Sequence, residues 1–242
     1  MKTPAPGIFK SNISITKNLI CLILGATVLA MQHGRANDAG SVFNLSDIAD
    51  GKSWKVSDAT AEALVVDGKK VAHLRATGDS ANGDVGLALA NGKEFSTGEI
   101  ELDLKAMSPH RCFLGIAFNV TDTKTFEAIY FRPFNFRTNE PYRLRAVQYL
   151  AWPRYTWERL RENSPGQYEK PINPPPDPEG WFHARIEVTA KQVLVFVNRA
   201  PEPSLAVQRL ATGGVKKPFG LFVDSHDGLY ADLQVRPTTA RL

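Results

Sequence analysis

The sequence predicts an all-β protein built as a sandwich of two antiparallel sheets, and three observations support this. From residue 42 onward, apolar and polar residues alternate with a period of two, which is typical of half-buried strands. Turn signals such as Asp67-Gly68 and Asn91-Gly92 separate roughly a dozen short strand candidates. Helical periodicity is almost absent, and residues 156–162, which Thr156 can cap, form the one modest helix candidate. This combination favours a sandwich over helical or mixed architectures.

The strands are expected at short intervals along the chain. The candidate ranges are 53–56, 63–66, 71–74, 85–89, 99–105, 112–118, 124–132, 146–150, 181–188, 193–198, 219–223 and 229–235. We expect hairpin turns at Asp67-Gly68 and Ala190-Lys191, and a closing turn at Asn91-Gly92. The segment 163–180 contains six prolines and is expected to be a stiff surface loop, whose length is typical of functional loops.

The first 36 residues have the three-part pattern of a secretory signal peptide. Three lysines precede residue 18, residues 18–31 are mostly apolar and uncharged, and Gly34-Arg35-Ala36 offers small residues for cleavage. The apolar run is short for a membrane span, so an uncleaved anchor is the alternative. We predict export to the periplasm or the exterior, a single domain over residues 37–242, and no membrane span after processing.

The predicted leader also changes the charge of the chain. It contains four of the 29 Lys and Arg residues and no acidic residue, so 25 basic and 25 acidic side chains remain. This balance argues against nucleic acid as a partner, because such surfaces need clustered positive charge. Cys112 is then the lone cysteine, which excludes an intramolecular disulfide and predicts a small core residue.

Aromatic rings and arginines alternate unusually densely over residues 124–162. Rings offer flat apolar faces and guanidinium groups offer fixed donors, a combination that suits a polar, ring-shaped ligand such as a sugar. Because a buried arginine is costly unless paired, we expect Arg132 to lie in a groove or against a carboxylate. The alternative is that these rings cover an edge of the sandwich, with arginines stacked over them. The predicted ligand-binding residues are Tyr130, Arg132, Asn135, Gln148, Tyr149, Trp152, Trp157 and His183.

Carboxylates on one predicted strand are the first candidates for catalysis. Glu99, Glu101 and Asp103 share a face, and residues two apart on a strand are separated by about 6.6 Å. Glycosidases use carboxyl pairs separated by roughly 5 to 9.5 Å, so the spacing is permitted. A solvated polar face is the alternative interpretation of this strand. Glu127 and Glu158 are further candidates for an acid/base pair.

No cofactor and no metal are expected. The four histidines after the leader, His73, His110, His183 and His226, are isolated and lack zinc-site spacing. The sequence Asp-Ser-His-Asp-Gly at 224–228 is an incomplete calcium loop and more typical of a tight turn.

Several stretches resemble the laminin G-like pattern of adjoining strands. The residues concerned are Trp181-x-His183-x-x-Ile186, Val195-Phe196-Val197-Asn198, Phe219 to Val223, Tyr230 to Leu233 and Gly98 to Asp103. The resemblance covers most of residues 95–237 and implies a concanavalin A-like lectin/glucanase jelly roll, with two curved sheets and a concave ligand face. Exported bacterial proteins of this type include 3-keto-disaccharide hydrolase domains. The laminarinase-like branch carries E-x-D-x-E or E-x-D-x-x-E, whereas this chain has Glu99-x-Glu101-x-Asp103 followed by Lys105.

The sequence therefore predicts an exported carbohydrate-binding β-sandwich whose groove is lined by aromatic residues and arginines. The expected partner is an oligo- or polysaccharide. The first alternative is a glycoside hydrolase of the glucanase or 3-keto-disaccharide hydrolase type that uses a carboxylate pair. The second alternative is a protein-interaction module of the cell envelope.

Overall fold

The computed structural model describes residues 40–78, 83–107, 111–211 and 213–238, which belong to one compact unit. The predicted leader 1–36 and His110 lie outside the described residues, so the signal peptide and the domain boundary at residue 37 remain predictions. In the described ranges, no helix is both long and apolar enough to cross a membrane.

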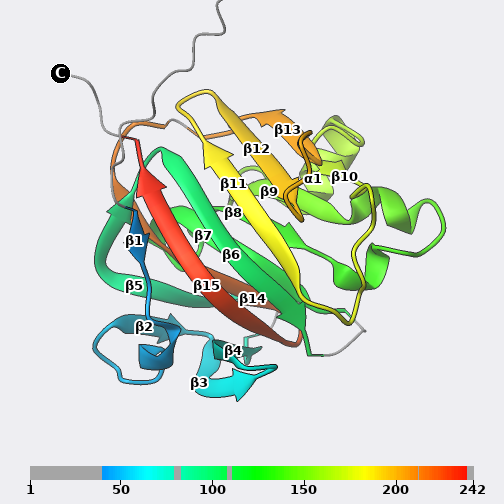
Figure 1. The fold of residues 1–242 in the computed structure, drawn as a ribbon. Helices are drawn as coiled ribbons and strands as arrows, with labels where there is room; N and C mark the ends of the chain where they lie inside the picture. The colour runs from blue at the N-terminus through cyan, green and yellow to red at the C-terminus, as the bar shows by residue number, and fades with distance from the viewer. Residues whose placement is uncertain (1–39, 79–82, 108–110, 212, 239–242) are drawn as a thin grey trace, which may run out of the picture. The chain divides into compact units, whose positions relative to one another are not determined.

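The described residues form two antiparallel sheets, as the sequence predicts. Sheet A has the order β13 (Leu205–Gln208), β12 (Gln192–Val197), β11 (Phe182–Val188), β6 (Gly98–Ala106), β15 (Asp227–Pro237), β4 (Lys69–Ala76) and β3 (Ala59–Val66), and β1 (Ser41–Val42) pairs with β15. Sheet B has the order β10 (Glu169–Lys170), β9 (Val147–Trp152), β8 (Thr125–Phe131), β7 (Phe113–Asp122), β14 (Lys217–Asp224), β5 (Gly86–Phe95) and β2 (Trp54–Ser57). Figure 1 shows β11, β6 and β15 side by side, with β7 and β8 behind them.

The core lies between the inner faces of the two sheets. Ile100, Leu102 and Leu104 of β6 are fully buried there, because alternation turns every second residue of the strand inward. Phe131 of β8 packs edge-on against Phe182 of β11, with ring centroids 5.1 Å apart, and this contact joins the sheets. Cys112 is also buried, and the burial, together with nearby carboxylates, raises the pKa of its thiol to about 12.

The outer face of sheet B is also largely apolar. Phe222 of β14, Gly115 of β7 and Tyr130 of β8 lie opposite one another in one row across three strands. Because Gly115 has no side chain, the rings of Phe222 and Tyr130 stack with centroids 5.4 Å apart. A Cβ at Gly115 would lie 2.0 Å from the backbone oxygen of Ile129. This face is therefore packed closely enough to hold Tyr130 in a fixed position.

One turn prediction is confirmed and another is wrong. Asp67-Gly68 joins β3 to β4 as a two-residue hairpin with both residues at positive φ. Asn91-Gly92 is not a closing turn, because β5 continues through it to Phe95. Gly92 has φ +67°, and the pairing of β5 with β14 shifts register next to this position. The dipeptide therefore supplies the positive φ of a bulge within the strand.

The helix prediction and the loop prediction both hold in outline. The helix α1 (Trp157–Asn163) begins after Thr156, whose side chain accepts a hydrogen bond from the Arg159 backbone N–H. Two 3₁₀ helices, η3 (Pro133–Asn135) and η4 (Tyr142–Arg145), connect β8 to β9, and a third, η1 (Leu45–Asp47), lies near the start. The proline-rich loop includes β10, which adds a short strand to the edge of sheet B.

Candidate functional site

A cavity of about 520 Å³ lies beside the outer face of sheet B, where β7, β8 and β14 meet η3, η4 and α1. We call it the Arg132 pocket. Its lining residues are Arg111, Phe113, Tyr130, Arg132, Phe134, Asn135, Tyr142, Arg145, Trp157, Glu158, Arg161, Asp224 and Ser225. Aromatic rings and guanidinium groups therefore meet in one cavity, as the density of these residues in 124–162 suggested.

The floor of the pocket is a buried hydrogen-bond cluster. The Tyr130 hydroxyl donates to Gln148 Oε1 at 3.0 Å and accepts from the guanidinium of Arg132 at 2.8 Å. Arg132 also donates to Gln148 Oε1 and to the Arg145 backbone oxygen. Burial raises the pKa of Tyr130 to about 12, so its hydroxyl stays protonated and able to donate. These contacts hold the Arg132 guanidinium over the Tyr130 ring, 4.9 Å from its centroid.

One wall of the pocket is fixed by the buried carboxylate of Glu169 on β10. Arg161 of α1 binds both of its oxygens, at 2.9 and 2.7 Å. Arg132 and Arg145 approach the same carboxylate at 3.7 and 3.6 Å. The hydrogen bond to Glu169 raises the pKa of Arg161, which reflects a guanidinium stabilised in its charged form. The edge strand β10 thus positions three arginines along the pocket.

The rim of the pocket presents exposed aromatic side chains. Trp157 is 38% exposed and Tyr142 is 59% exposed, which is unusual for rings of this size in a folded domain. The Arg161 guanidinium lies 4.7 Å from the centroid of the Trp157 ring. Phe134 packs edge-on against Phe113, with ring centroids 5.5 Å apart, at the same cavity. The rim therefore offers apolar ring surface beside the polar floor.

The structure brings five of the eight predicted ligand-binding residues together. Tyr130, Arg132, Asn135 and Trp157 line the pocket, and Gln148 lies directly beneath it. Arg132 was expected in a groove or against a carboxylate, and its side chain both lines the cavity and lies 3.7 Å from the Glu169 carboxylate. The alternative is also partly correct, since arginines do stack over rings here.

Tyr149 and Trp152, two further residues of the predicted set, lie apart from the pocket. Tyr149 has no exposed surface, because it follows Gln148 on β9 and alternation points it inward between the sheets. Its hydroxyl bonds to Glu127 and accepts from the Leu210 backbone N–H at 3.0 Å, so it packs the core. Trp152 does not line the pocket and instead lies against Gly83.

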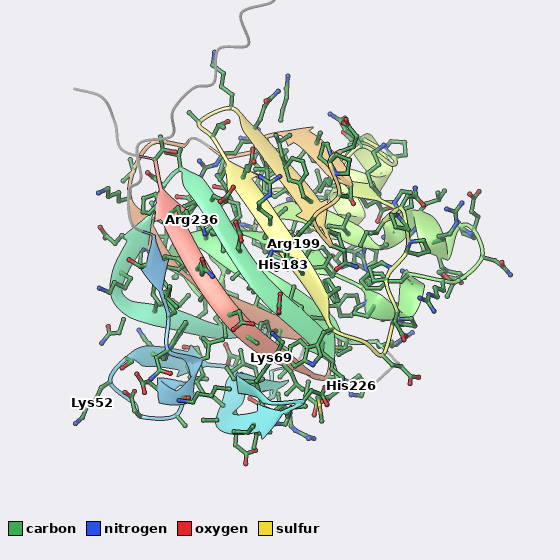
Figure 2. The ribbon with its side chains drawn as sticks, in the orientation of Figure 1. Lys52, Lys69, His183, Arg199, His226 and Arg236 are labelled. Carbon is green, nitrogen blue, oxygen red and sulfur yellow. The ribbon has the colours of Figure 1, made fainter. Side chains whose placement is uncertain are left out.

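His183 and the strand carboxylates lie on the outer face of the other sheet. Figure 2 shows His183, Lys69 and Arg236 on the outer face of sheet A. His183 pairs with Asp103, with Nδ1 2.8 Å from the carboxylate, because β11 and β6 align these two positions. Lys69 also binds Asp103 at 2.9 Å.

Glu99 and Glu101, the two glutamates of this strand, form ion pairs with arginines. Arg236 donates to Glu99 and to Glu101 at 2.7 Å each, and Arg185 donates to Glu99 at 3.2 Å. This arrangement matches the alternative interpretation of a polar outer face, here crosslinked by ion pairs. Glu99, Glu101 and Asp103 therefore lie on a different sheet from the Arg132 pocket.

Glu127, the fourth catalytic candidate, is buried between the sheets. Its carboxylate receives three hydrogen bonds from the Arg209 guanidinium, at 2.7 to 3.1 Å, and one from Asn119 at 2.8 Å. Glu127 and Arg209 side chains are each 1% exposed. Such a pair joins sheet B to the segment after β13, and its location excludes contact with a ligand at the surface.

Sequence reasoning missed several pocket residues for a physical reason. Arg145 and Arg161 belong to the arginine-rich stretch, but their convergence depends on Glu169, which lies in the proline-rich loop. Arg111, Phe113 and Asp224 come from distant strand ends, which β7 and β14 place opposite each other. Glu158, a predicted acid/base candidate, does line the pocket, and the helix candidate at 156–162 was the available signal for Arg161. Within the described ranges, no group of three or more His, Cys, Asp and Glu residues is placed to hold a metal ion.

The comparisons with known proteins define the fold of the chain. No protein-family model matches the sequence, and no curated protein is significantly similar to it. Among solved structures, the carbohydrate-binding module CBM66 from Bacillus subtilis matches with a TM-score of 0.53 and 12% identity, covering 76% of this chain and 96% of that one. A protein of unknown function with a galectin-like fold, also from Bacillus subtilis, matches with a TM-score of 0.52 and 14% identity over 83% and 96% of the chains. The fold is therefore a galectin-like and concanavalin A-like jelly roll.

Proposed function

We propose that this protein is an exported carbohydrate-binding protein that holds a sugar in the Arg132 pocket. The observation that carries the proposal is the meeting of exposed rings at the rim with buried, fixed donors at the floor of one cavity. The fold shared with a carbohydrate-binding module supports the proposal. Export rests on the leader pattern of residues 1–36.

The chemistry of a sugar matches these two surfaces. A pyranose or furanose ring presents C–H groups that pack on an aromatic face and hydroxyls that need hydrogen-bond partners. An unpaired buried hydroxyl costs on the order of 1–3 kcal/mol. In the proposed complex, Trp157 supplies the ring face, while Arg132 and Asn135 supply donors. The cavity volume of about 520 Å³ lies within the usual range for small-ligand sites.

Titration of a glycan panel against the purified protein tests this function. We expect binding by one sugar class and, for Trp157→Ala, an affinity about tenfold lower with an unchanged unfolding midpoint, since Trp157 is exposed. Trp181→Ala is the matched control, because Trp181 lies on the outer face of sheet A, near Lys69 and Lys105. Loss of binding in Trp181→Ala with full binding in Trp157→Ala would place the sugar site on sheet A and contradict the proposal.

A glycoside hydrolase is the second candidate, because two carboxylates, Glu158 and Asp224, line the same pocket. Hydrolysis requires an acid and a second carboxylate on the two sides of the scissile bond. Product release from a bound glycan that stops in both Glu158→Gln and Asp224→Asn would favour hydrolysis. Binding without product release would favour the binding protein.

A further inference from the structure

The charges around the Arg132 pocket do not cancel. Among the residues that the structure describes, four guanidinium groups and two carboxylates line the cavity, and one further carboxylate, that of Glu169, lies behind its wall. The four guanidinium groups are Arg111, Arg132, Arg145 and Arg161. The balance is one positive charge in a partly enclosed space, where charge interactions are stronger than in bulk water.

Glu169 is shared among three cations. Arg161 occupies both of its oxygens, so Arg132 and Arg145 meet them only at 3.7 and 3.6 Å, beyond hydrogen-bond distance. One carboxylate neutralises one guanidinium, and the excess positive charge faces the cavity that these side chains line.

The Arg132 side chain is 6% exposed, less than those of Arg145 and Arg161, so water stabilises its charge least. Its hydrogen bonds go to neutral acceptors, namely the Arg145 backbone oxygen, the Tyr130 hydroxyl and the Gln148 amide oxygen. The Tyr130 and Phe113 rings offset part of the charge through their faces, at 4.9 and 5.5 Å from the guanidinium. A buried cation with this set of partners is stabilised further by a bound anion.

We propose that the Arg132 pocket selects a sugar residue that carries a carboxylate, such as a uronic acid, and this selectivity rests on the sugar-binding function proposed above. The arginine fork matches the planar geometry of a carboxylate, and Arg161 already binds Glu169 in this way. The carboxylates of Glu158 and Asp224 accept hydrogen bonds from the sugar hydroxyls. Rings at the rim hold the sugar body while Arg132 and Arg145 face its charge.

Matched pairs of oligosaccharides test this selectivity. Each pair contains an oligouronide (of glucuronic, galacturonic or mannuronic acid) and the same oligosaccharide after reduction of its carboxylates to primary alcohols. Reduction keeps the linkage and most of the ring but removes the charge. We expect at least one oligouronide to bind about tenfold or more tightly than its reduced partner, by calorimetry at low salt. The difference should shrink as salt is added, since salt screens partly exposed charges.

The outcomes separate the two proposals. Equal or tighter binding of the reduced or other neutral oligosaccharides would overturn the charge selectivity and leave sugar binding intact. Binding of none of the sugars would overturn both. Binding of inorganic phosphate or acetate as tight as that of the oligouronide would overturn both as well, because the pocket would then recognise an anion without a sugar.

Charge variants of the protein provide a second test with opposite expected signs. Arg145→Gln removes one cation while keeping the backbone oxygen that accepts from Arg132, so oligouronide affinity should fall about tenfold. Arg199→Gln is the matched control, because this exposed arginine lies in the turn after β12 of sheet A (Figure 2). The affinity of this variant for the oligouronide should equal that of the wild type.

Glu169→Gln removes the competing internal carboxylate and also a contact that positions the arginines, so the ratio of oligouronide affinity to the affinity for the reduced partner should rise, whatever the change in either affinity alone. A purely structural role for Glu169 would lower both affinities equally and contradict the proposal. If Glu169→Gln does not fold, the Arg145→Gln and Arg199→Gln pair still decides the question.

Discussion

Asp103 shows how a single residue on the outer face of sheet A links stability to pH. Burial alone would raise the pKa of its carboxyl group. Hydrogen bonds from His183 and Lys69, together with their charges, outweigh that effect and hold the pKa at about 2, below the usual 3.8. A carboxylate with a depressed pKa in the folded state stabilises the protein above its unfolded-state pKa.

Asp103→Asn should therefore remove a pH-dependent part of the stability. The contribution of Asp103 is fully present above about pH 4 and is lost as pH falls toward its folded pKa. We expect urea-unfolding midpoints of the wild type and Asp103→Asn to differ most above pH 4 and to converge near pH 2. A constant difference between the two curves from pH 7 to pH 2 would show that Asp103 stabilises the fold by other means.

Some contacts between single residues could be predicted from the sequence, and others could not. Alternation places Tyr130 and Arg132 on one face of their strand and separates Gln148 from Tyr149 on the next strand. The pairing of β8 with β9 then brings Tyr130 and Gln148 within hydrogen-bond distance. The same alternation excludes Tyr149 from that face, since it follows Gln148 directly. His183 could not be assigned from its neighbours, because the pairing of β11 with β6 determines its contact with Asp103.

At the scale of single elements, strand β7 depends on a glycine. Gly115 lies between Phe222 and Tyr130, and a Cβ there would meet the Ile129 backbone oxygen of β8 at 2.0 Å. A backbone oxygen cannot move aside as a flexible side chain can. A methyl group added at position 115 must therefore push β7 and β8 apart.

Gly115→Ala should therefore destabilise the protein by about 3 kcal/mol, the upper part of the usual cost of overpacking. Gly92→Ala is the comparison, because Gly92 has open space around it and only a positive φ, which costs about 1–2 kcal/mol. Urea unfolding of both variants measures the difference. Equal losses would mean that the packing at Gly115 relaxes without separating the strands.

Element boundaries were predictable where strands are long and regular. Strands β6 and β11 alternate strictly and were found from the sequence within a residue or two of their observed ends. Strands β1 and β10 were missed, because two residues are too few for a period to show. The four-residue strand β13 was missed as well. The bulge at Gly92 was mistaken for a turn, since the same dipeptide supplies positive φ in both settings.

At the scale of the whole molecule, the buried pair of Glu127 and Arg209 ties the two sheets together. Glu127 belongs to β8 of sheet B, and Arg209 directly follows β13 of sheet A. Arg209 also donates to the backbone oxygens of Ser96 and Thr189, at 3.1 and 3.2 Å, which fixes neighbouring connections. The adjacent Tyr149 hydroxyl has a raised pKa, because of burial and then of the nearby Glu127 charge.

Arg209→Met should cost about 3–5 kcal/mol of stability, because it leaves the Glu127 carboxylate buried without its cation. The double variant Glu127→Gln and Arg209→Met should recover part of this loss, since neither charge then remains unpaired. Unfolding free energies of the two single variants and the double variant give the coupling between the residues. Additive losses would indicate that the pair does not join the sheets as a unit.

The fold class was predictable at this scale, whereas the site was predictable only as a region. Alternation and turn signals are enough to predict two packed antiparallel sheets, because a sheet with one apolar face must bury that face against a second layer. The pocket instead requires long-range placement of β10, α1 and the ends of β7 and β14, which no local pattern encodes. Glu169 is the clearest case, since a residue of a proline-rich loop organises three arginines from two other segments.

A crystal structure of the protein with the tightest-binding oligosaccharide of the panel shows whether the Arg132 pocket holds the sugar. We expect a sugar ring against Trp157, with hydroxyls or a carboxylate within hydrogen-bond distance of Arg132 and Arg145. A sugar bound instead on the outer face of sheet A, beside Trp181 and His183, with the Arg132 pocket holding none, would contradict it.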